Sequence, residues 1–244
     1  MFLGAALAAG CQEDVGDIGG VFYDGDGRSV HCAVDLDDDA HNSLASIDSA
    51  LDRAAARGEV AELYAHSPGG TVPIAVVEHV LVGARDRGLA FVTYSDFAAG
   101  VGTGPGIALS FDDTSVDAWY AMRPQFQAVG ARITFFVSRY AALRPEQQAK
   151  LHELAADGHV IEAHSVLHLR APEYVEDHGL AAYIDEEVVP SIERMRSDGF
   201  PVTSFAYPFG ARTHEIDRAI LEHVAILRSI SFTYTGPVVD ACPQ

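Results

Sequence analysis

Short apolar runs alternate with longer amphipathic segments along most of the chain. The apolar runs predict buried strands, and the segments with apolar residues every three or four positions predict helices. The predicted strands are 30–34, 60–65, 89–93, 107–111, 133–137, 159–163, 203–207 and 229–234, and the predicted helices are 43–57, 72–87, 115–129, 145–156, 180–197 and 213–225. This alternation is typical of parallel strands joined by right-handed crossovers. We therefore expect an α/β fold, a (β/α)7–8 distorted TIM-like barrel that forms one domain over residues 30–244.

Two segments interrupt the alternation. Residues 1–29 join a short apolar start to a Gly- and Asp-rich loop, and residues 98–106 (AAGVGTGPG) predict a linker. The stretch from Leu7 to Cys11 resembles a bacterial lipoprotein cleavage box, with Cys11 as the lipidated residue. No Lys or Arg precedes it, as a signal peptide requires, so either the chain starts further upstream or the match is a coincidence.

The composition restricts the partners. The formal net charge of −19 argues against nucleic acids and anionic membrane surfaces, which would repel the chain, but not against a neutral glycan. No apolar run approaches the roughly 20 residues that span a bilayer. Besides Cys11, the chain has Cys32 and Cys242, which could form a disulfide in an oxidising compartment or remain two separate small hydrophobic residues.

The run Ile107–Asp113 (IALSFDD) ends in two adjacent carboxylates. Asp112 and Asp113 follow a predicted buried strand, and parallel α/β folds carry their chemistry at the carboxyl ends of strands. Two neighbouring negative charges that lose hydration need a cation or a shared proton to compensate them. Alternatively, Asp113, Thr114 and Ser115 simply cap the next helix.

Three other predicted strands end in chemically active residues. His164 and His168 lie four apart and would face the same side of a helical turn, which suits a zinc site completed by a carboxylate, or only a solvated turn. The segment 205–210 (FAYPFG) predicts a rigid turn that can aim a backbone N–H at a reacting oxygen, or an ordinary turn. His66, at the end of LYAH, is a candidate functional histidine at a strand end or a histidine bonded to backbone at the edge of the core.

In combination these four motifs resemble the polysaccharide deacetylases, the NodB-homology or carbohydrate esterase family 4 group. The family's (T/S)FDD motif matches residues 110–113, its H(S/T)xxH motif matches residues 164–168, and its RPP(Y/F)G motif falls on residues 206–210. The resemblance covers most of residues 30–240. It implies the same barrel and an acetylated glycan as substrate.

The order of the motifs differs from the family. The family's leucine-x-x-histidine motif comes last, whereas here the block 30–97 that contains it comes first. We therefore predict a circular permutation, in which 30–97 corresponds to the family's C-terminal part, 98–106 joins the old ends and 107–244 corresponds to its N-terminal part. The alternative is a truncated deacetylase behind an unrelated N-terminal domain.

The resemblance also implies roles for individual residues. Asp113, His164 and His168 would hold one divalent metal ion, with zinc expected. Asp112 would act as the general base on a metal-activated water whose pKa falls to about 7. The oxyanion would be stabilised by the metal ion and by the backbone N–H of Phe209.

Further roles follow from the remaining motifs. Tyr207 and Pro208 would form the substrate-binding turn with Phe209. Protonated His66 would deliver a proton to the leaving amine, with its pKa tuned by Asp35 or Asp37. Leu63 would line the pocket for the acetyl methyl group.

One departure from the family concerns the orientation of the base. Ala206 occupies the position of the arginine that orients it, so Arg170 or Arg212 would have to replace that arginine.

The resemblance predicts a metal-dependent polysaccharide deacetylase that removes N-acetyl groups from a glycan containing N-acetylglucosamine. Its expected location is outside the cytoplasm, in the periplasm or at the cell surface, with a lipid anchor if Cys11 is modified. An O-acetyl esterase of the xylan type, a non-catalytic glycan-binding envelope protein on the same fold and a metal-dependent amidase are the alternatives.

Overall fold

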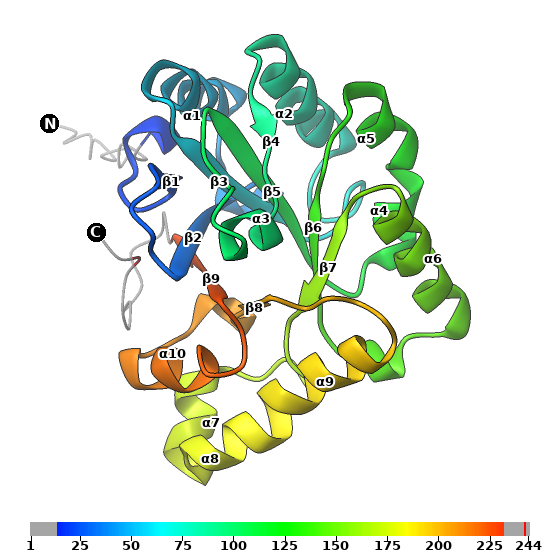
Figure 1. Ribbon diagram of the computed structural model, residues 1–244. Helices are drawn as coiled ribbons and strands as arrows, with labels where there is room; N and C mark the ends of the chain where they lie inside the picture. Colours follow the sequence, from blue (N-terminus) through cyan, green and yellow to red (C-terminus); the bar gives the residue numbers. More distant parts are fainter. Residues whose placement is uncertain (1–13, 232–241, 243–244) are drawn as a thin grey trace, which may run out of the picture.

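The structure is a computed structural model that describes residues 14–231 and 242, with helices arranged around a central set of strands (Figure 1). The strands are β1 (Phe22–Tyr23), β2 (Val30–Asp35), β3 (Val60–Ala65), β4 (Ala90–Phe91), β5 (Gly106–Asp113), β6 (Thr134–Val137), β7 (Val160–Ala163), β8 (Ser204–Ala206) and β9 (Ile226–Ser231). The α-helices are α1 (Leu44–Arg57), α2 (Ile74–Asp86), α3 (Tyr94–Ala98), α4 (Val116–Ala121), α5 (Arg123–Val129), α6 (Pro145–Ala156), α7 (Ala171–His178), α8 (Leu180–Tyr183), α9 (Val189–Ser197) and α10 (His214–Ile220). Short helical turns are η1 (Val15–Asp17), η2 (Asp38–Ala40), η3 (Tyr140–Ala142), η4 (Ile184–Val188) and η5 (Pro208–Gly210).

Within the described residues, seven parallel strands close into a ring in the order β2, β3, β5, β6, β7, β8 and β9. The ring closes because β9 pairs with β2, and the two strands lie side by side in Figure 1. The predicted distorted α/β barrel is confirmed. The predicted strand at 89–93 is only the short β4, which pairs with the start of β5. β4 is not a member of the ring, because all of β3 pairs directly with β5.

The helices differ from the predicted ones where proline intervenes. The helix expected over 115–129 is divided into α4 and α5, with Pro124 in the first turn of α5. Proline lacks an N–H and is tolerated only at such a position, so the break falls there. The helix expected over 180–197 is α8, a π-helical turn η4 and α9, with Pro190 in the first turn of α9.

The predicted linker is a packed turn. A Cβ atom on Gly104 would come within 2.4 Å of the Glu59 carbonyl oxygen, so only glycine fits there. The N–H of Gly106 donates to the same oxygen over 3.0 Å. The glycine content of this segment therefore reflects a close backbone approach at the start of β5.

The hydrophobic core has two parts. The larger lies between the outward faces of the strands and the helices and includes Leu63, Phe111 and Trp119. The smaller fills the barrel end where the strands begin, with Tyr94 and Phe97 of α3 packed among strand residues. This leaves the opposite end, where the strands finish, for polar side chains.

Cys32 on β2 and Cys242 form a disulfide that ties two positions 210 residues apart in the sequence. The predicted lipidation site, Cys11, lies outside the described residues. None of the helices in residues 14–231 has the length and apolar character that crossing a membrane requires.

Candidate active site

A cavity of about 350 Å³ opens at the carboxyl end of the barrel strands. Its walls combine carboxylates, histidines, arginines and aromatic rings that come from five different strand ends. The lining residues are Tyr64, His66, Asp112, Asp113, His164, His168, Arg170, Tyr207, Phe209, Gly210, Arg228 and Ile230.

Asp113, His164 and His168 converge on one point of this cavity. His168 Nε2 lies 3.1 Å from Asp113 Oδ1 and 3.2 Å from His164 Nε2, and His164 Nε2 lies 3.6 Å from Asp113 Oδ1. Tetrahedral ligands with bonds of about 2.0–2.1 Å to zinc are separated from each other by roughly 3.3 Å. The spacing of these three atoms therefore fits one divalent ion.

The chemical state of His164 also suits metal binding. Its Nδ1 lies 2.8 Å from the Ala206 carbonyl oxygen, to which it donates, so its Nε2 carries the lone pair. Burial lowers the pKa of His164 to about 4 and keeps the ring neutral. For Asp113, burial favours the neutral form, but the hydrogen bond with His168 and the nearby His164 lower the pKa below its usual value. Neutral imidazole and ionised carboxylate are the forms that bind metal.

The loop between the histidines is not the helical turn that their spacing predicts. Ser165 and His168 have left-handed backbones, with φ of 68° and 65°, and α7 begins only at Ala171. Asp113 (φ 81°) and Phe209 (φ 58°) share this conformation, so four of the six non-glycine residues with positive φ in the described chain line this cavity or adjoin it. Such strain persists where the surrounding structure imposes it, commonly at functional sites.

Asp112 is buried next to the three converging residues, with Oδ2 3.9 Å from His164 Nε2. Arg228 of β9 donates from Nη2 to Asp112 Oδ2, whereas Asp112 Oδ1 has no partner among the described residues. The guanidinium of Arg228 is fully buried between the rings of Tyr64 and Phe136, at 4.9 and 5.0 Å from their centroids.

The arginine that contacts Asp112 is Arg228, and not one of the two that the sequence offered for the missing position. Arg212 binds Asp217, and Arg170 pairs with Glu173. Sequence reasoning missed Arg228, although a lone arginine inside the apolar strand ILRSIS was a usable signal, because a buried charge requires a partner.

His66 faces the same cavity, and its Nδ1 is bonded to Asp37 Oδ2. Asp37 is fixed in turn by the hydroxyl of Thr71, which donates to Oδ1 over 2.9 Å. Burial alone would lower the pKa of His66, but the bond to Asp37 and the charges of Asp112 and Asp113 raise it to about 9. His66 is therefore protonated at neutral pH.

Of the two carboxylates expected near His66, Asp37 makes the contact. Asp35 accepts a hydrogen bond from the Tyr64 hydroxyl over 2.7 Å and from the Asp37 N–H over 2.9 Å. Asp35, Asp37 and His66 form a second group with ligand-like spacing among the described residues. Their atoms are engaged with one another and with Tyr64, so we interpret the group as a hydrogen-bond network around His66.

The predicted substrate-binding residues are only partly brought together. Phe209 is 48% exposed at the rim, with its ring 4.7 Å from that of His168. Tyr207 lines the cavity, but its hydroxyl is bonded to Asp217 over 2.8 Å, and Pro208 is buried in η5 and does not line the cavity. The prediction for Leu63 is wrong: its side chain packs in the outer core, because alternate residues of β3 face opposite sides and Tyr64 takes the inner one.

A parallel barrel that gathers carboxylates and histidines in one cavity at its carboxyl end has the arrangement of a barrel enzyme's active site. The sequence model of the polysaccharide deacetylases matches residues 100–225, just over half of the chain. The chain belongs to the polysaccharide deacetylase family. No curated protein matches the sequence significantly.

Solved structures share this fold. A polysaccharide deacetylase from Bacillus cereus superposes with a TM-score of 0.58 at 16% identity, over 70% of this chain and 58% of its own. IcaB from Ammonifex degensii gives 0.56 at 20% identity, over 71% and 85% of the two chains. A de-N-acetylase from Aggregatibacter actinomycetemcomitans gives 0.55 at 16% identity, over 72% and 96%. The alignment therefore spans less than two thirds of the Bacillus protein, and at these identities the likeness concerns the fold.

Proposed function

We propose that the protein is a metal-dependent deacetylase that hydrolyses the N-acetyl groups of a glycan containing N-acetylglucosamine. The observation that carries this proposal is the convergence of Asp113, His164 and His168 beside Asp112 and a protonated His66 in one cavity. The first three residues would hold a divalent ion, with zinc expected, and this ion would supply Lewis acidity toward the acetyl carbonyl and lower the pKa of water.

Asp112 is the proposed general base. Its free Oδ1 accepts a proton from the attacking water, while Arg228 holds Oδ2 and so fixes the direction of the carboxylate. Arg228 thereby fills the role of the arginine that is missing at Ala206. On this proposal the departure at Ala206, which weakly favoured the non-catalytic alternative, no longer argues for it.

His66 is the proposed general acid. Asp37 engages its Nδ1, which leaves the Nε2 proton for the leaving nitrogen. An amine is a poor leaving group until it is protonated, so a histidine with a pKa near 9 favours an amide over an O-acetyl ester as substrate. The backbone N–H of Phe209, at the cavity rim, is the proposed donor to the oxyanion.

Acetate release from N-acetylglucosamine oligomers in the presence of zinc tests the reaction. We expect activity in the wild type and a loss of about 10²–10⁴-fold in Asp112→Asn, with zinc still bound. Asp177→Asn, an exposed change on α7, is the matched control. Zinc binding without acetate release would favour a glycan-binding protein. Equal activity in the wild type and Asp112→Asn would refute Asp112 as the general base. Acetate release from acetylated xylan alone would indicate an O-acetyl esterase.

We also propose that the barrel is a circular permutation of the family's order. The family match begins at residue 100, inside the joining segment 98–106. The strand that leads into LYAH, β3, pairs directly with β5, which ends in FDD. The first and last motifs of the family's order therefore lie on neighbouring strands, although LYAH precedes FDD in this chain. A gene that encodes 100–244 followed by 14–99 should therefore give the same fold and activity. Autonomous folding of 100–244 alone would instead support a truncated deacetylase behind a separate domain.

We further propose that the protein acts outside the cytoplasm. The Cys32–Cys242 disulfide supports this, because disulfides persist in oxidising compartments. Mass spectrometry of the N-terminal peptide from cells tests lipidation of Cys11, and an unmodified thiol would refute the anchor.

A further inference from the structure

The loop that carries both histidines of the cavity, residues 164–168, has an irregular backbone that must be held in place. Ser165 and His168 are left-handed, a conformation that non-glycine residues keep only where the surroundings impose it. The His168 N–H donates to Ser165 Oγ over 2.9 Å, which closes the loop on itself. Two residues from outside the loop, Glu187 and Arg139, bind its backbone.

Glu187 accepts hydrogen bonds from the N–H groups of this histidine loop. Its side-chain Oε2 accepts from the Leu167 N–H over 2.8 Å, and its carbonyl oxygen accepts from the Val166 N–H over 3.2 Å. A carboxylate makes a stronger hydrogen bond than a neutral acceptor does. One residue therefore fixes two consecutive peptide units between the two histidines.

The place of Glu187 in the fold is unusual. Its side chain is buried, with 1% of the residue exposed, and it belongs to the π-helical turn η4 between α8 and α9. Burying a carboxylate has a desolvation cost that an apolar residue would avoid, so its presence needs an explanation. Turns of this kind are rare and are frequent at functional sites. Glu186, in the same turn, is exposed and accepts from the Tyr174 hydroxyl over 2.5 Å, so of these two glutamates Glu187 reaches the loop.

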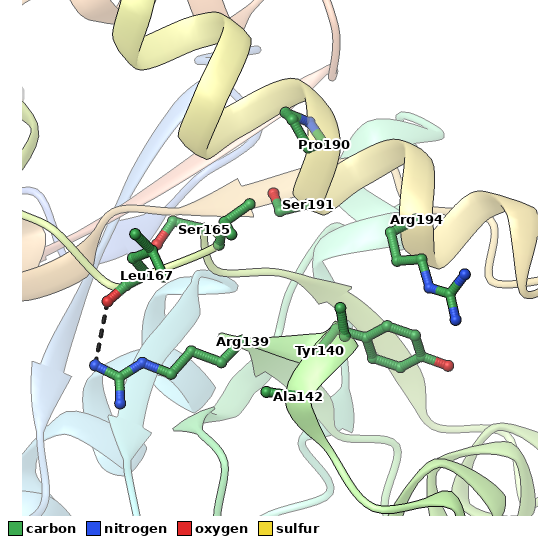
Figure 2. A pocket seen from close by; sticks show the side chains of 10 residues that line it. Arg139, Tyr140, Ala142, Ser165, Leu167, Pro190, Ser191 and Arg194 are labelled. Carbon is green, nitrogen blue, oxygen red and sulfur yellow. Dashed lines mark hydrogen bonds between the residues drawn. The ribbon is translucent and has the colours of Figure 1, made fainter.

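Arg139, in the turn after β6, donates to the carbonyl groups of the loop. Its backbone N–H donates to the Ser165 carbonyl oxygen over 3.2 Å. Its Nη2 donates to the Leu167 carbonyl oxygen over 3.1 Å, and Figure 2 shows this bond as a dashed line. The stretch 165–167 borders a cavity of about 180 Å³, so side chains do not fill the space on that side of the loop. The polar bonds therefore do much of the holding.

We propose that Glu187 is a positioning residue that sets the place of His168 through the backbone of the histidine loop. This inference rests on the proposed metal-dependent function. His164 is fixed separately, because its Nδ1 donates to the Ala206 carbonyl oxygen over 2.8 Å. Its Nε2 lies 3.2 Å from that of His168, the spacing that a shared ion requires. Ligands that are held at this spacing before the ion arrives bind it with less loss of freedom.

Two variants separate the reach of the Glu187 side chain from its charge. Glu187→Asp keeps the carboxylate but is one methylene too short for the Leu167 N–H, whereas Glu187→Gln keeps the reach and loses the charge. We expect Glu187→Asp to weaken zinc binding by about 10–100-fold, measured by competition with a chelator, and Glu187→Gln to remain within about fivefold of the wild type. Glu186→Asp shortens a carboxylate in the same turn and, as the matched control, should bind zinc like the wild type.

Cobalt-substituted protein gives a readout that a general loss of stability would not change. The visible absorption bands of cobalt depend on the geometry of its ligands, so we expect altered bands in Glu187→Asp and wild-type bands in Glu187→Gln. Equal zinc affinity and equal bands in all three proteins would overturn the proposal. A loss in Glu187→Gln as large as that in Glu187→Asp would also overturn it, because charge and not reach would then matter. If Glu187→Asp does not fold, Glu187→Gln alone decides by this second criterion, a loss above tenfold counting against the proposal.

The metal-free protein distinguishes a failure of this inference from a failure of the proposed function. Hydrogen–deuterium exchange of the peptide that contains residues 164–168 should be faster in Glu187→Asp than in the wild type and Glu187→Gln. A wild type that binds no divalent ion would refute the proposed function. Equal exchange in the three metal-free proteins would overturn the role of Glu187 in holding the loop, whether or not the wild type binds zinc.

Discussion

Arg228 binds Asp112 from the position opposite Ala206, the residue that stands where the family has its arginine. Ala206 and Arg228 are paired Cα partners in the β8–β9 register, and Arg228 Nη2 donates to Asp112 Oδ2. The guanidinium therefore comes from β9, the strand next to the one that carries Ala206, at the same level of the barrel. The small side chain of Ala206 leaves room for it, so the two positions are complementary.

Arg228→Ala should lower kcat by about 10- to 100-fold with little change in KM, because the base stays in the site but loses its fixed direction. Steady-state kinetics with zinc content and a melting curve measure this. Arg218→Ala, an exposed change on α10, is the control. An unchanged kcat in folded, zinc-loaded Arg228→Ala would show that Arg228 does not position the base.

Moving the arginine back to the neighbouring strand should restore activity. We expect the double variant Ala206→Arg with Arg228→Ala to have a kcat at least tenfold above that of Arg228→Ala alone. The reason is that the new guanidinium starts at the same level of the barrel. Ala206→Arg alone should be destabilised, because a second buried guanidinium finds its space and its carboxylate already taken. Failure of the double variant to exceed Arg228→Ala, with its fold intact, would contradict this complementarity.

The basic limb of the pH–rate profile should depend on Asp37. His66 must be protonated to act as an acid, so activity falls as pH rises through its pKa, which is about 9 in the presence of Asp37. Asp37→Asn removes the charge that raises this pKa and should shift the basic limb of kcat/KM to lower pH by about one unit or more. Asp39→Asn, an exposed change in η2, serves as the control, and a basic limb that does not move in Asp37→Asn would refute the role of His66.

His159 should make the protein less stable in acid. Burial lowers its pKa to about 4, and its Nδ1 accepts a hydrogen bond from the Ile133 N–H over 3.1 Å, which a proton on Nδ1 would break. The unfolded chain, with a histidine pKa near 6.5, binds the proton first, so stability is lost as pH falls from about 6.5 to 4, by about 3 kcal/mol.

Urea unfolding of wild type and His159→Gln between pH 7 and pH 4 measures this loss. The difference between the two free energies of unfolding should shrink as pH falls, because Gln carries no titrating group. His178→Gln, at an exposed position, should run parallel to the wild type. Parallel curves for His159→Gln as well would exclude His159 as the source.

The Cys32–Cys242 disulfide should stabilise the barrel by about 2–4 kcal/mol. It joins β2, the first strand of the ring, to a position beyond β9, the last strand, and so supports the pairing that closes the barrel. A reductant should lower the urea midpoint of the wild type and leave that of Cys242→Ser unchanged. A wild-type midpoint that ignores the reductant would mean that the disulfide contributes nothing to stability.

The sequence by itself determined the barrel and, through the motifs that resemble the family, the three residues that converge in the cavity. Both depend on local signals: apolar runs that end in polar residues predict parallel strands, and such strands bring their carboxyl ends to one rim. For this reason Asp113, His164 and His168 could be assigned to one site although 55 residues separate the first from the last. The disagreement over Leu63 also has a local cause, since the alternation of β3 already assigns Leu63 and Tyr64 to opposite faces.

Only the tertiary structure decided which partners hold these residues. Arg228 reaches Asp112 because β9 follows β8 around the ring, and Asp37 rather than Asp35 meets His66 because of how the turn after β2 folds against the end of β3. The histidine loop has left-handed residues in place of a helical turn, which no spacing rule predicts. Strand ends are local features of a chain, whereas the neighbours of a buried charge are set by ring closure, which brings together segments without regard to their distance in sequence.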